Sequence, residues 1–372
     1  MSEIVNEVSP GQAGEEGNSL HPENVFVPDA STASRGLLGN KLRLRNVLQS
    51  QGLLGILLLL GLFFTLKSQY FLTWPNILTI GTGTSVLGVM TVAQTYLIIS
   101  GGIDVSVGSV VAFSGVIMGL LLSHGVNPWI AIVVTLLSGA GVGAVNGFVV
   151  IRLNINPFIT TLGTMSIFSG WAYVLAANDV LPASQNIFRV IGVDKFIGLP
   201  INLEIFLVLV IIAFIMERFT VLGRAIYAIG GNREASRLAG LQVKLIPFWL
   251  YVASGTSASL AAIIITSQLE AASPQVGSTY LLTVVTAVIL GGASLAGGRG
   301  TIIGTFIAVL ILSVLQNGFG LLELSSFAQS IAIGVALIVA VLIDQAVRRS
   351  SGLALKKARG KRVVTGGGSA QI

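Results

Sequence analysis

Asp104 is a single carboxylate within a long apolar run, "IISGGIDVSVGSV" at residues 98–110. A charge is costly in an apolar medium, and paired glycines such as Gly101 and Gly102 weaken a helix. The glycines predict a tight turn after which Asp104 caps the next helix by accepting hydrogen bonds from free backbone N–H groups. The alternative is a proton or cation site in a broken helix. We favour the cap, since it needs no further partner, and expect a turn at the cytoplasmic boundary rather than at mid-membrane.

A second pattern, "GGNREASRLAGL" at residues 230–241, predicts a short capped helix. Asn232 is placed to cap its start, and Gly240 to end it. One face carries Ala235, Leu238 and Ala239, and the polar side carries Arg233, Glu234 and Arg237, with Glu234 in reach of Arg237. Because a helix of two turns is marginal in water, the two end signals and the apolar stripe indicate a docking helix for a cytoplasmic partner rather than a solvated loop.

Few polar side chains interrupt the apolar segments, among them Gln94, Asn146, Thr161 and Ser254. Intramembrane polar groups face protein or a water-filled cavity. Gln94 and Asn146, whose amides suit hydroxylated solutes, are candidates for a translocation path together with Thr161. The alternative is hydrogen bonding between helices, which we favour for Ser and Thr. The glycines of "GAGVG" at 139–143 predict close helix packing.

Several kinds of chemistry are disfavoured. The chain has no cysteine and only two histidines, in a polar tail and a short loop, so we expect no metal site and no catalytic residues. The nucleotide-binding pattern GxxxxGK[ST] does not occur, so any ATPase must be another subunit. The net charge of +6 comes from residues at the ends of apolar segments and not from a basic stripe, which argues against nucleic acid as a partner.

The elements that must position these residues are apolar helices. The chain has 372 residues, 53% hydrophobic and 10% charged, whereas soluble domains carry about 25% charged residues. This composition predicts an all-α, polytopic transmembrane helix bundle in a lipid bilayer. The ten expected spans are 51–70, 76–100, 104–123, 129–151, 157–177, 203–219, 246–267, 280–296, 301–321 and 327–347.

Charge and composition predict the organisation around these spans. Residues 1–45 form a polar, disordered cytoplasmic tail, 46–347 the membrane domain with a cytoplasmic loop at 218–245, and 348–372 a basic cytoplasmic tail. With both termini inside, all Lys and Arg except Lys67, Arg189 and Lys195 fall on the cytoplasmic side, as the positive-inside rule requires.

Four ordered stretches between residues 50 and 347 resemble the permease subunits of bacterial ABC importers for monosaccharides, the ribose, xylose and galactose class. They are "IISGGIDVSVGSV", "NGFVVIRLNINPFITTLGTMSIFSGWAY", "LGRAIYAIGGNREASRLAGL" and "GGASLAGGRGTIIGTFIAVLIL". The last stretch contains Gly291 and Gly292, which weakly echo Gly101 and Gly102 and predict a second helix break.

The resemblance implies an importer permease in the bacterial inner membrane. Residues 232–240 would be the region that couples to a cytoplasmic ATP-binding subunit, which uses ATP and Mg, while this chain binds no cofactor. A periplasmic or extracellular sugar-binding protein would deliver the substrate, and the permease would form a homodimer or pair with a homologous permease. Paired glycines at 101–102 and 291–292 would permit bends where helices rock. The sequence does not distinguish pentose, hexose or polyol.

Two other functions remain open at this point. An ion-coupled secondary transporter of a small polar solute requires ionisable groups at membrane depth, for which Asp104 and Glu270 are the candidates. A passive channel or structural membrane subunit would not need the capped cytoplasmic helix.

Overall fold

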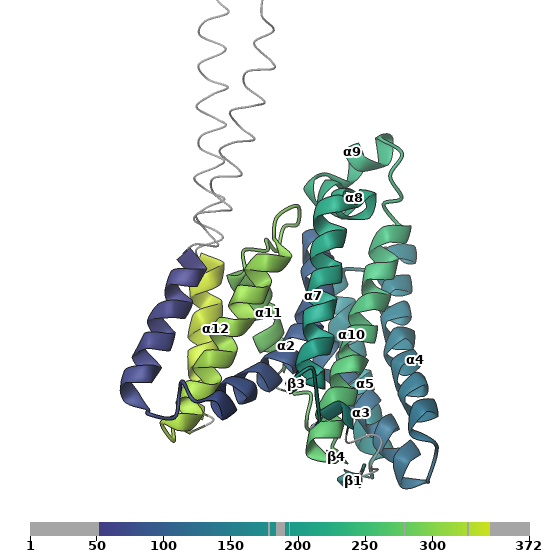
Figure 1. The fold of residues 1–372 in the computed structure, drawn as a ribbon. Coiled ribbons are helices and arrows are strands. Elements are labelled where there is room, and N and C mark those ends of the chain that lie inside the picture. The colour runs from purple at the N-terminus through teal and green to yellow at the C-terminus, as the bar shows by residue number, and fades with distance from the viewer. Residues whose placement is uncertain are drawn as a thin grey trace, which may run out of the picture. The chain divides into compact units, whose positions relative to one another are not determined.

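The computed structural model describes residues 52–342, apart from 178, 184–189, 193, 279 and 326 (Figure 1). Both predicted tails, 1–45 and 348–372, lie outside this part of the chain. Its long apolar elements begin with a helix at Gly52–Lys67 and end with one at Phe327–Leu342. Between them come α2 (Trp74–Ile99), α3 (Val107–Ser123), α4 (Pro128–Gly147) continued by a π-helix (Phe148–Arg152), α5 (Pro157–Leu175), α7 (Ile201–Phe219), α10 (Leu245–Leu269), α11 (Tyr280–Leu290) and α12 (Ile302–Leu321).

Short elements connect these helices. Helices α8 (Val221–Gly231) and α9 (Arg233–Leu238) follow α7. Among the described residues, four two-residue strands form two antiparallel pairs: β1 (Leu181–Pro182) with β4 (Ala271–Ala272), and β2 (Lys195–Phe196) with β3 (Leu199–Pro200). The first pair places Leu181 opposite Ala272, so the segment after α5 is joined to the segment after α10.

Asparagine followed by proline starts two of the apolar helices. The side chain of Asn127 accepts a hydrogen bond from the N–H of Trp129 at the start of α4, and Asn156 does the same for Phe158 in α5. The proline after each asparagine has no N–H, which is no loss in a first turn whose N–H groups lack helical partners. These local signals place the two helix starts within one residue of the predicted spans.

Helix α10 packs against α4, α2 and α3 (Figure 1). A Cβ atom added to Gly139 would lie 2.3 Å from the carbonyl oxygen of Gly255, and one added to Gly143 would lie 2.3 Å from that of Tyr251. Higher numbers in α4 therefore meet lower numbers in α10, and the two helices run antiparallel with their backbones nearly touching. The prediction that the glycines at 139–143 serve close helix packing is confirmed for Gly139 and Gly143, whereas Gly141 has no atom within 4 Å of an added Cβ.

Apolar helices occur at all ten predicted positions, but only some are long enough to cross a bilayer. In the described part of the chain, five helices qualify by length and composition, and α7 with α8, bent by 73°, would make a sixth. The remaining four are 10–17 residues long. The all-α membrane bundle is thus supported, while ten crossings and the location of both termini stay predictions.

Two predicted spans are wrong at one end. The span expected at 280–296 stops as a helix at Leu290, because Gly292 takes a positive φ of 96° and turns the chain. The span expected at 104–123 begins as a helix only at Val107, after an irregular segment that follows α2. Both errors come from glycine turns that shorten a helix inside an otherwise continuous apolar run.

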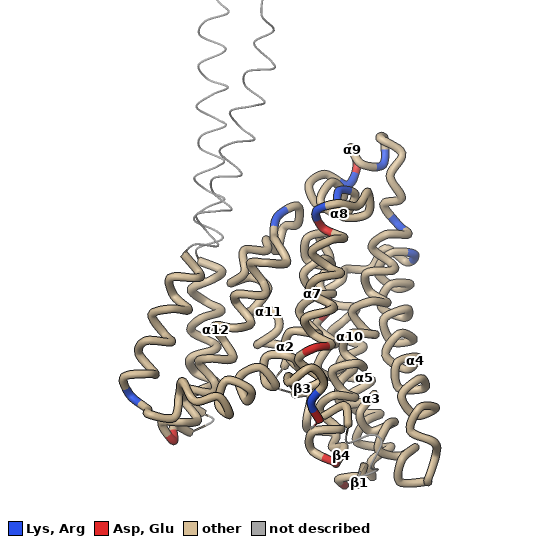
Figure 2. Tube along the Cα trace, in the orientation of Figure 1, with Lys and Arg blue, Asp and Glu red and all other residues tan. Residues whose placement is uncertain are grey.

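Figure 2 shows Lys and Arg gathering at the end of the bundle that carries α8 and α9. Arg152, at the end of the π-helix that continues α4, and Lys244, just before α10, lie at this end. The loop 291–301, whose Gly298 contacts α8, lies there too. This asymmetry has the direction that the positive-inside rule requires for a cytoplasmic α9.

Candidate coupling and transport site

Helix α9 forms where it was predicted, with both predicted end signals in place. The side chain of Asn232 accepts a hydrogen bond from the N–H of Ala235 at 2.9 Å. At the other end Gly240 has a φ of +81°, and the N–H groups of Gly240 and Leu241 bond back to carbonyls of the last turn. This is a Schellman motif, in which the glycine supplies a conformation that other residues rarely adopt.

The predicted apolar face of α9 is open to its surroundings. Ala235, Leu238 and Ala239 are exposed, and Leu238 shows 78% of its surface. Beside them, the Arg237 guanidinium lies 2.6 Å from a Glu234 carboxylate oxygen, and this contact lowers the pKa of Glu234 below its ordinary value. An exposed ion pair adds little to stability, and exposed apolar side chains pack little against the described part of the chain. The outward side of α9 therefore has no evident role in stabilising the fold.

Other contacts hold α9 in place. Thr220 sits at the sharp bend between α7 and α8, where its hydroxyl accepts a hydrogen bond from the N–H of Gly223 and so starts α8. The guanidinium of Arg233 donates to the carbonyl of Val243 at 3.2 Å, which ties the start of α9 to the loop before α10. Within α9 only Ser236 is buried. The short helix is therefore carried at the end of α8 with its apolar side outward.

Asp104 is completely buried at the meeting point of three elements. Its Oδ1 accepts hydrogen bonds from the backbone N–H of Ser106 at 2.9 Å and from the Ser106 hydroxyl at 2.6 Å. Its Oδ2 accepts from the hydroxyl of Ser254 in α10 at 2.8 Å, and Asn146 of α4 lies 3.5 Å from Oδ1. The carboxyl group thus joins the turn before α3 to α4 and α10.

This arrangement differs from the expected helix cap. The turn is present, but α3 starts at Val107 with Ser106 at the cap position, and Asp104 receives the N–H of Ser106 ahead of the helix. Its partner Ser254 lies nine residues after Leu245, about 14 Å along α10 at 1.5 Å per residue. Asp104 is therefore inside the bundle and not at its rim, because the irregular segment after α2 folds inward between α4 and α10.

The three residues predicted for a translocation path are all fully buried. Gln94 donates to the backbone carbonyl of Asp104 at 3.1 Å, and the amide oxygen of Asn146 accepts from Thr164 at 2.7 Å. Thr161 bonds to the carbonyl of Pro157 in its own helix. Gln94 and Asn146 thus make contacts between elements, the alternative that the sequence left open, and their place on a path stays a prediction.

Replacing Asp104 with Asn is expected to leave folding and transport nearly intact, whereas Asp104→Leu is expected to lower stability markedly. Asn keeps an oxygen for Ser106 and presents an amide to Ser254. Leu leaves buried donors without an acceptor, at about 1–3 kcal/mol for each. Thermal unfolding in detergent and solute uptake in proteoliposomes measure the two effects. Loss of uptake in a well-folded Asn variant would instead show that the carboxyl group must ionise.

Both predicted helix breaks are present. Helix α2 ends at Ile99 and α11 ends at Leu290. Gly101, with φ +86°, and Gly292, with φ +96°, each follow the last turn and close a Schellman motif. The similarity between the two stretches is thus structural, but shifted by one residue, since Gly101 corresponds to Gly292 and not to Gly291. Bending at these breaks stays a prediction.

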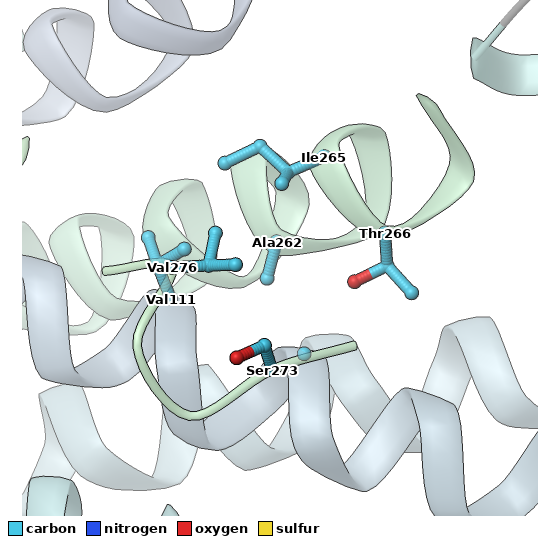
Figure 3. Close-up of a pocket in the computed structure, with 7 residues that line it drawn as sticks. Val111, Ala262, Ile265, Thr266, Ser273 and Val276 are labelled. Atoms are coloured by element: carbon cyan, nitrogen blue, oxygen red, sulfur yellow. The ribbon is translucent and has the colours of Figure 1, made fainter. Parts of the chain in front are cut away.

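A small cavity lies between α3, α10 and the segment after β4 (Figure 3). Its volume is about 10 Å³, roughly the space that one water molecule requires. Figure 3 shows Thr266 of α10 and Ser273 of the coil segment at this cavity, among apolar neighbours. It is much too small for a monosaccharide and is not a candidate for the sugar path.

The sequence analysis missed the role of Ser106, and it assigned Ser254 to hydrogen bonding between helices without identifying Asp104 as its partner. A usable signal existed for Ser106, since an Asp two residues before a Ser is typical of a side chain that bonds to the backbone two residues ahead. No local signal exists for Ser254, which is separated from Asp104 by 150 residues.

Comparisons with known proteins agree on one class of protein. The family described as "Branched-chain amino acid transport system / permease component" matches residues 76–343. The ribose import permease protein RbsC of Escherichia coli (strain K12) is 37% identical over 302 residues, which cover 80% of this chain and 94% of the relative. No solved structure matches the chain at a significant level.

Two further relatives match over a similar extent. The ribose import permease protein RbsC of Bacillus subtilis (strain 168) is 35% identical over 80% of this chain and 94% of its own length. The L-arabinose transport system permease protein AraH of Escherichia coli (strain K12) is 33% identical over 86% and 97%. The family match at residues 76–343 extends from α2 beyond α12 and includes α8 and α9. The chain therefore belongs to the permease family of bacterial ABC-type monosaccharide importers and is a multi-pass protein of the inner membrane.

Proposed function

We propose that this chain forms the membrane path for a monosaccharide or related polyol and is driven by ATP hydrolysis in a separate subunit. A cytoplasmic ATP-binding subunit, which hydrolyses ATP with Mg as its cofactor, docks at α9. A sugar-binding protein on the other side of the membrane delivers the substrate. Two permeases, either identical or homologous, enclose the path between them. The relatives are named for ribose, allose and arabinose transport, which supports a sugar as the substrate class.

The exposed face of α9 is the observation that carries this proposal. The helix is fixed at both ends and carries an uncovered stripe of Ala235, Leu238 and Ala239. The two alanines allow another protein to approach closely, Leu238 offers it an exposed apolar side chain, and Glu234 and Arg237 supply polar contacts at the edge. A loop that only links two helices does not need a short helix that is capped at both ends and exposes an apolar stripe. A partner protein that docks on α9 is the best physical explanation for these features.

Reconstitution tests the proposed function. The permease is placed in proteoliposomes with its ATPase subunit, its binding protein and labelled ribose, arabinose and ribitol as probes. We expect uptake only with ATP on the side that carries α9, and none with an ATPase subunit that binds but does not hydrolyse ATP. Uptake of any probe without the ATPase subunit would overturn the proposal.

Ion-coupled transport is the second candidate, and the burial of Asp104 is the observation that favours it. Intramembrane carboxyl groups often serve proton or cation transport. The same proteoliposomes separate the two mechanisms, since an imposed pH or sodium gradient without ATP would then drive uptake. The hydrogen bonds from Ser106 and Ser254 give Asp104 a structural role that requires no such gradient.

A reporter that is active only outside the cytoplasm is expected to give no signal when it is fused to the C-terminus. The proposal places both termini in the cytoplasm, since the basic residues of 348–372 would otherwise be translocated against the positive-inside rule. Fusion of the same reporter after Lys195, on the predicted outward side, should give a strong signal as the control. A strong C-terminal signal would show that the C-terminus lies outside the cytoplasm and would overturn the ten-span topology with both ends inside.

A further inference from the structure

Glu217 occupies a position that its own helix does not explain. It lies in the last turns of α7, where the helix dipole disfavours an acidic side chain. Both of its carboxylate oxygens are used by other elements. Oε1 accepts a hydrogen bond from the hydroxyl of Tyr227 in α8 at 2.8 Å, and Oε2 accepts from the backbone N–H of Ile302, the first residue of α12, at 2.9 Å. The carboxylate thus bridges the start of α12 and the coupling segment, here defined as α8 with α9.

Tyr227 adds a second connection between the same elements. Its hydroxyl lies 2.6 Å from the carbonyl oxygen of Gly300, two residues before α12. A phenol has one proton to donate, so Glu217 and Gly300 share it. The start of α12 is therefore attached to α8 through a carboxylate and a phenol, in addition to its own cap, in which the Thr301 hydroxyl accepts from the N–H of Gly304.

The end of α8 also touches the break after α2, backbone against backbone. A Cβ atom added to Gly230 would lie 1.8 Å from the carbonyl oxygen of Ile99 and 2.6 Å from the nitrogen of Gly298. The N–H of Gly298 donates to that same Ile99 carbonyl at 2.7 Å. Three chain segments thus meet with no side chain between them: the end of α8, the end of α2 and the loop 291–301.

Helices α2 and α12 are joined to each other along their length. The hydroxyls of Thr95 and Thr305 lie 3.0 Å apart near the end that carries α8. Toward the other end, Asn76 and Asn317 exchange two side-chain hydrogen bonds of 3.0 and 2.8 Å. A displacement applied to the start of α12 is therefore passed on to α2.

We propose that Glu217 is a positioning residue that locks the coupling segment to α12, so that a push on α9 moves α8, the start of α12 and the break after α2 together. The proposal rests on the proposed function of α9 and adds the route by which its motion reaches the membrane helices. Glu217 touches neither the sugar nor the ATPase in this scheme. It keeps the moving parts in register while the ATPase subunits close.

Two substitutions of Glu217 distinguish the effect of its hydrogen bonds from the effect of its negative charge. Glu217→Ala removes both bonds. Glu217→Gln can keep all three contacts, because its oxygen accepts from Ile302, its amide donates to the Tyr227 oxygen, and Tyr227 then donates to Gly300. We expect the Ala variant to bind the ATPase normally but to transport about tenfold less sugar per ATP hydrolysed, within the roughly 5–150-fold range of coupling effects. The Gln variant should restore most of the coupling.

Tyr227→Phe tests the same lock by a milder change, which keeps the ring and removes only the hydroxyl. It should lower the ratio of sugar transported to ATP hydrolysed in the same direction as Glu217→Ala. Two matched controls carry the same chemical changes outside the lock. They are Tyr70→Phe, on an exposed tyrosine, and Glu323→Gln, on an exposed glutamate just after the other end of α12. Both controls should transport like the unmodified protein.

The distance between two spin labels distinguishes loss of the lock from a general loss of stability. The chain has no native cysteine, so labels attach only at cysteines placed at Ala228 in α8 and Ile303 in α12, both exposed. With Glu217 present, the distance between the labels should be narrow and equal in the ATP-free and ATP-bound complexes. In Glu217→Ala it should broaden or change with ATP.

Unchanged coupling and unchanged label distances in both Glu217→Ala and Tyr227→Phe would overturn this inference while leaving the role of α9 intact. Failure of the unmodified chain to bind the ATPase subunit would instead overturn the proposed function. The two failures are thus distinguished within one set of reconstituted complexes.

Discussion

Replacing Glu234 with Lys is expected to weaken binding of the ATPase subunit about a hundredfold, since a reversed charge at an interface brings like charges together and repels the partner. The substitution breaks the ion pair with Arg237 and puts a third cation between Arg233 and Arg237, all within two turns. It also places a positive charge in the first turn, which the helix dipole disfavours.

Co-purification of the ATPase with the permease, together with sugar-stimulated ATP hydrolysis, measures this effect. Ala235→Arg should act in the same direction, because a long charged side chain blocks close approach to the exposed face. Insertion should survive, since the altered side chains are exposed and lie outside the long apolar helices. Glu323→Lys, the same reversal on an exposed glutamate after α12, serves as the control. If both α9 variants assemble with the ATPase and couple like the wild type, residues 232–240 are only a solvated loop and not the docking site.

Gly143→Val is expected to prevent stable packing of α4 on α10. A Cβ atom there would lie 2.3 Å from the carbonyl oxygen of Tyr251 and 2.9 Å from the Cα of Val252. Backbone atoms of a helix cannot move aside by a change of rotamer, as a side chain can, so the two helices must separate. The cost should reach or exceed about 3 kcal/mol, the upper end of the usual range for overpacking.

The same helix supplies the matched control. Gly141 lies two residues away with no atom within 4 Å of its added Cβ, so Gly141→Val should be tolerated. Thermal unfolding in detergent and the monodisperse fraction in size-exclusion chromatography compare the two variants. Equal stability of Gly143→Val and Gly141→Val would contradict the close approach of α4 and α10.

Local patterns made much of this molecule predictable. The apolar runs placed the long helices, and the whole construction of α9, from Asn232 to Gly240, depends on residues within a few positions of one another. Helix caps and glycine turns act over one or two turns, so their signals stand side by side in the sequence. The same holds for the two breaks after α2 and α11, although the sequence did not indicate that Gly292 rather than Gly291 takes the positive φ at the second break.

What only the tertiary structure decided are the contacts between distant segments. Ser254 reaches Asp104 across 150 residues, and the Glu217 carboxylate meets the N–H of Ile302 across 85. Such pairs depend on which faces of two apolar helices meet and at what depth. A helix that is apolar on all sides does not reveal its packing face, because lipid and protein neighbours favour the same side chains. The sequence by itself therefore determined the class of protein and the capped helix α9, whereas the burial of Asp104 and the position of Glu217 followed from packing alone.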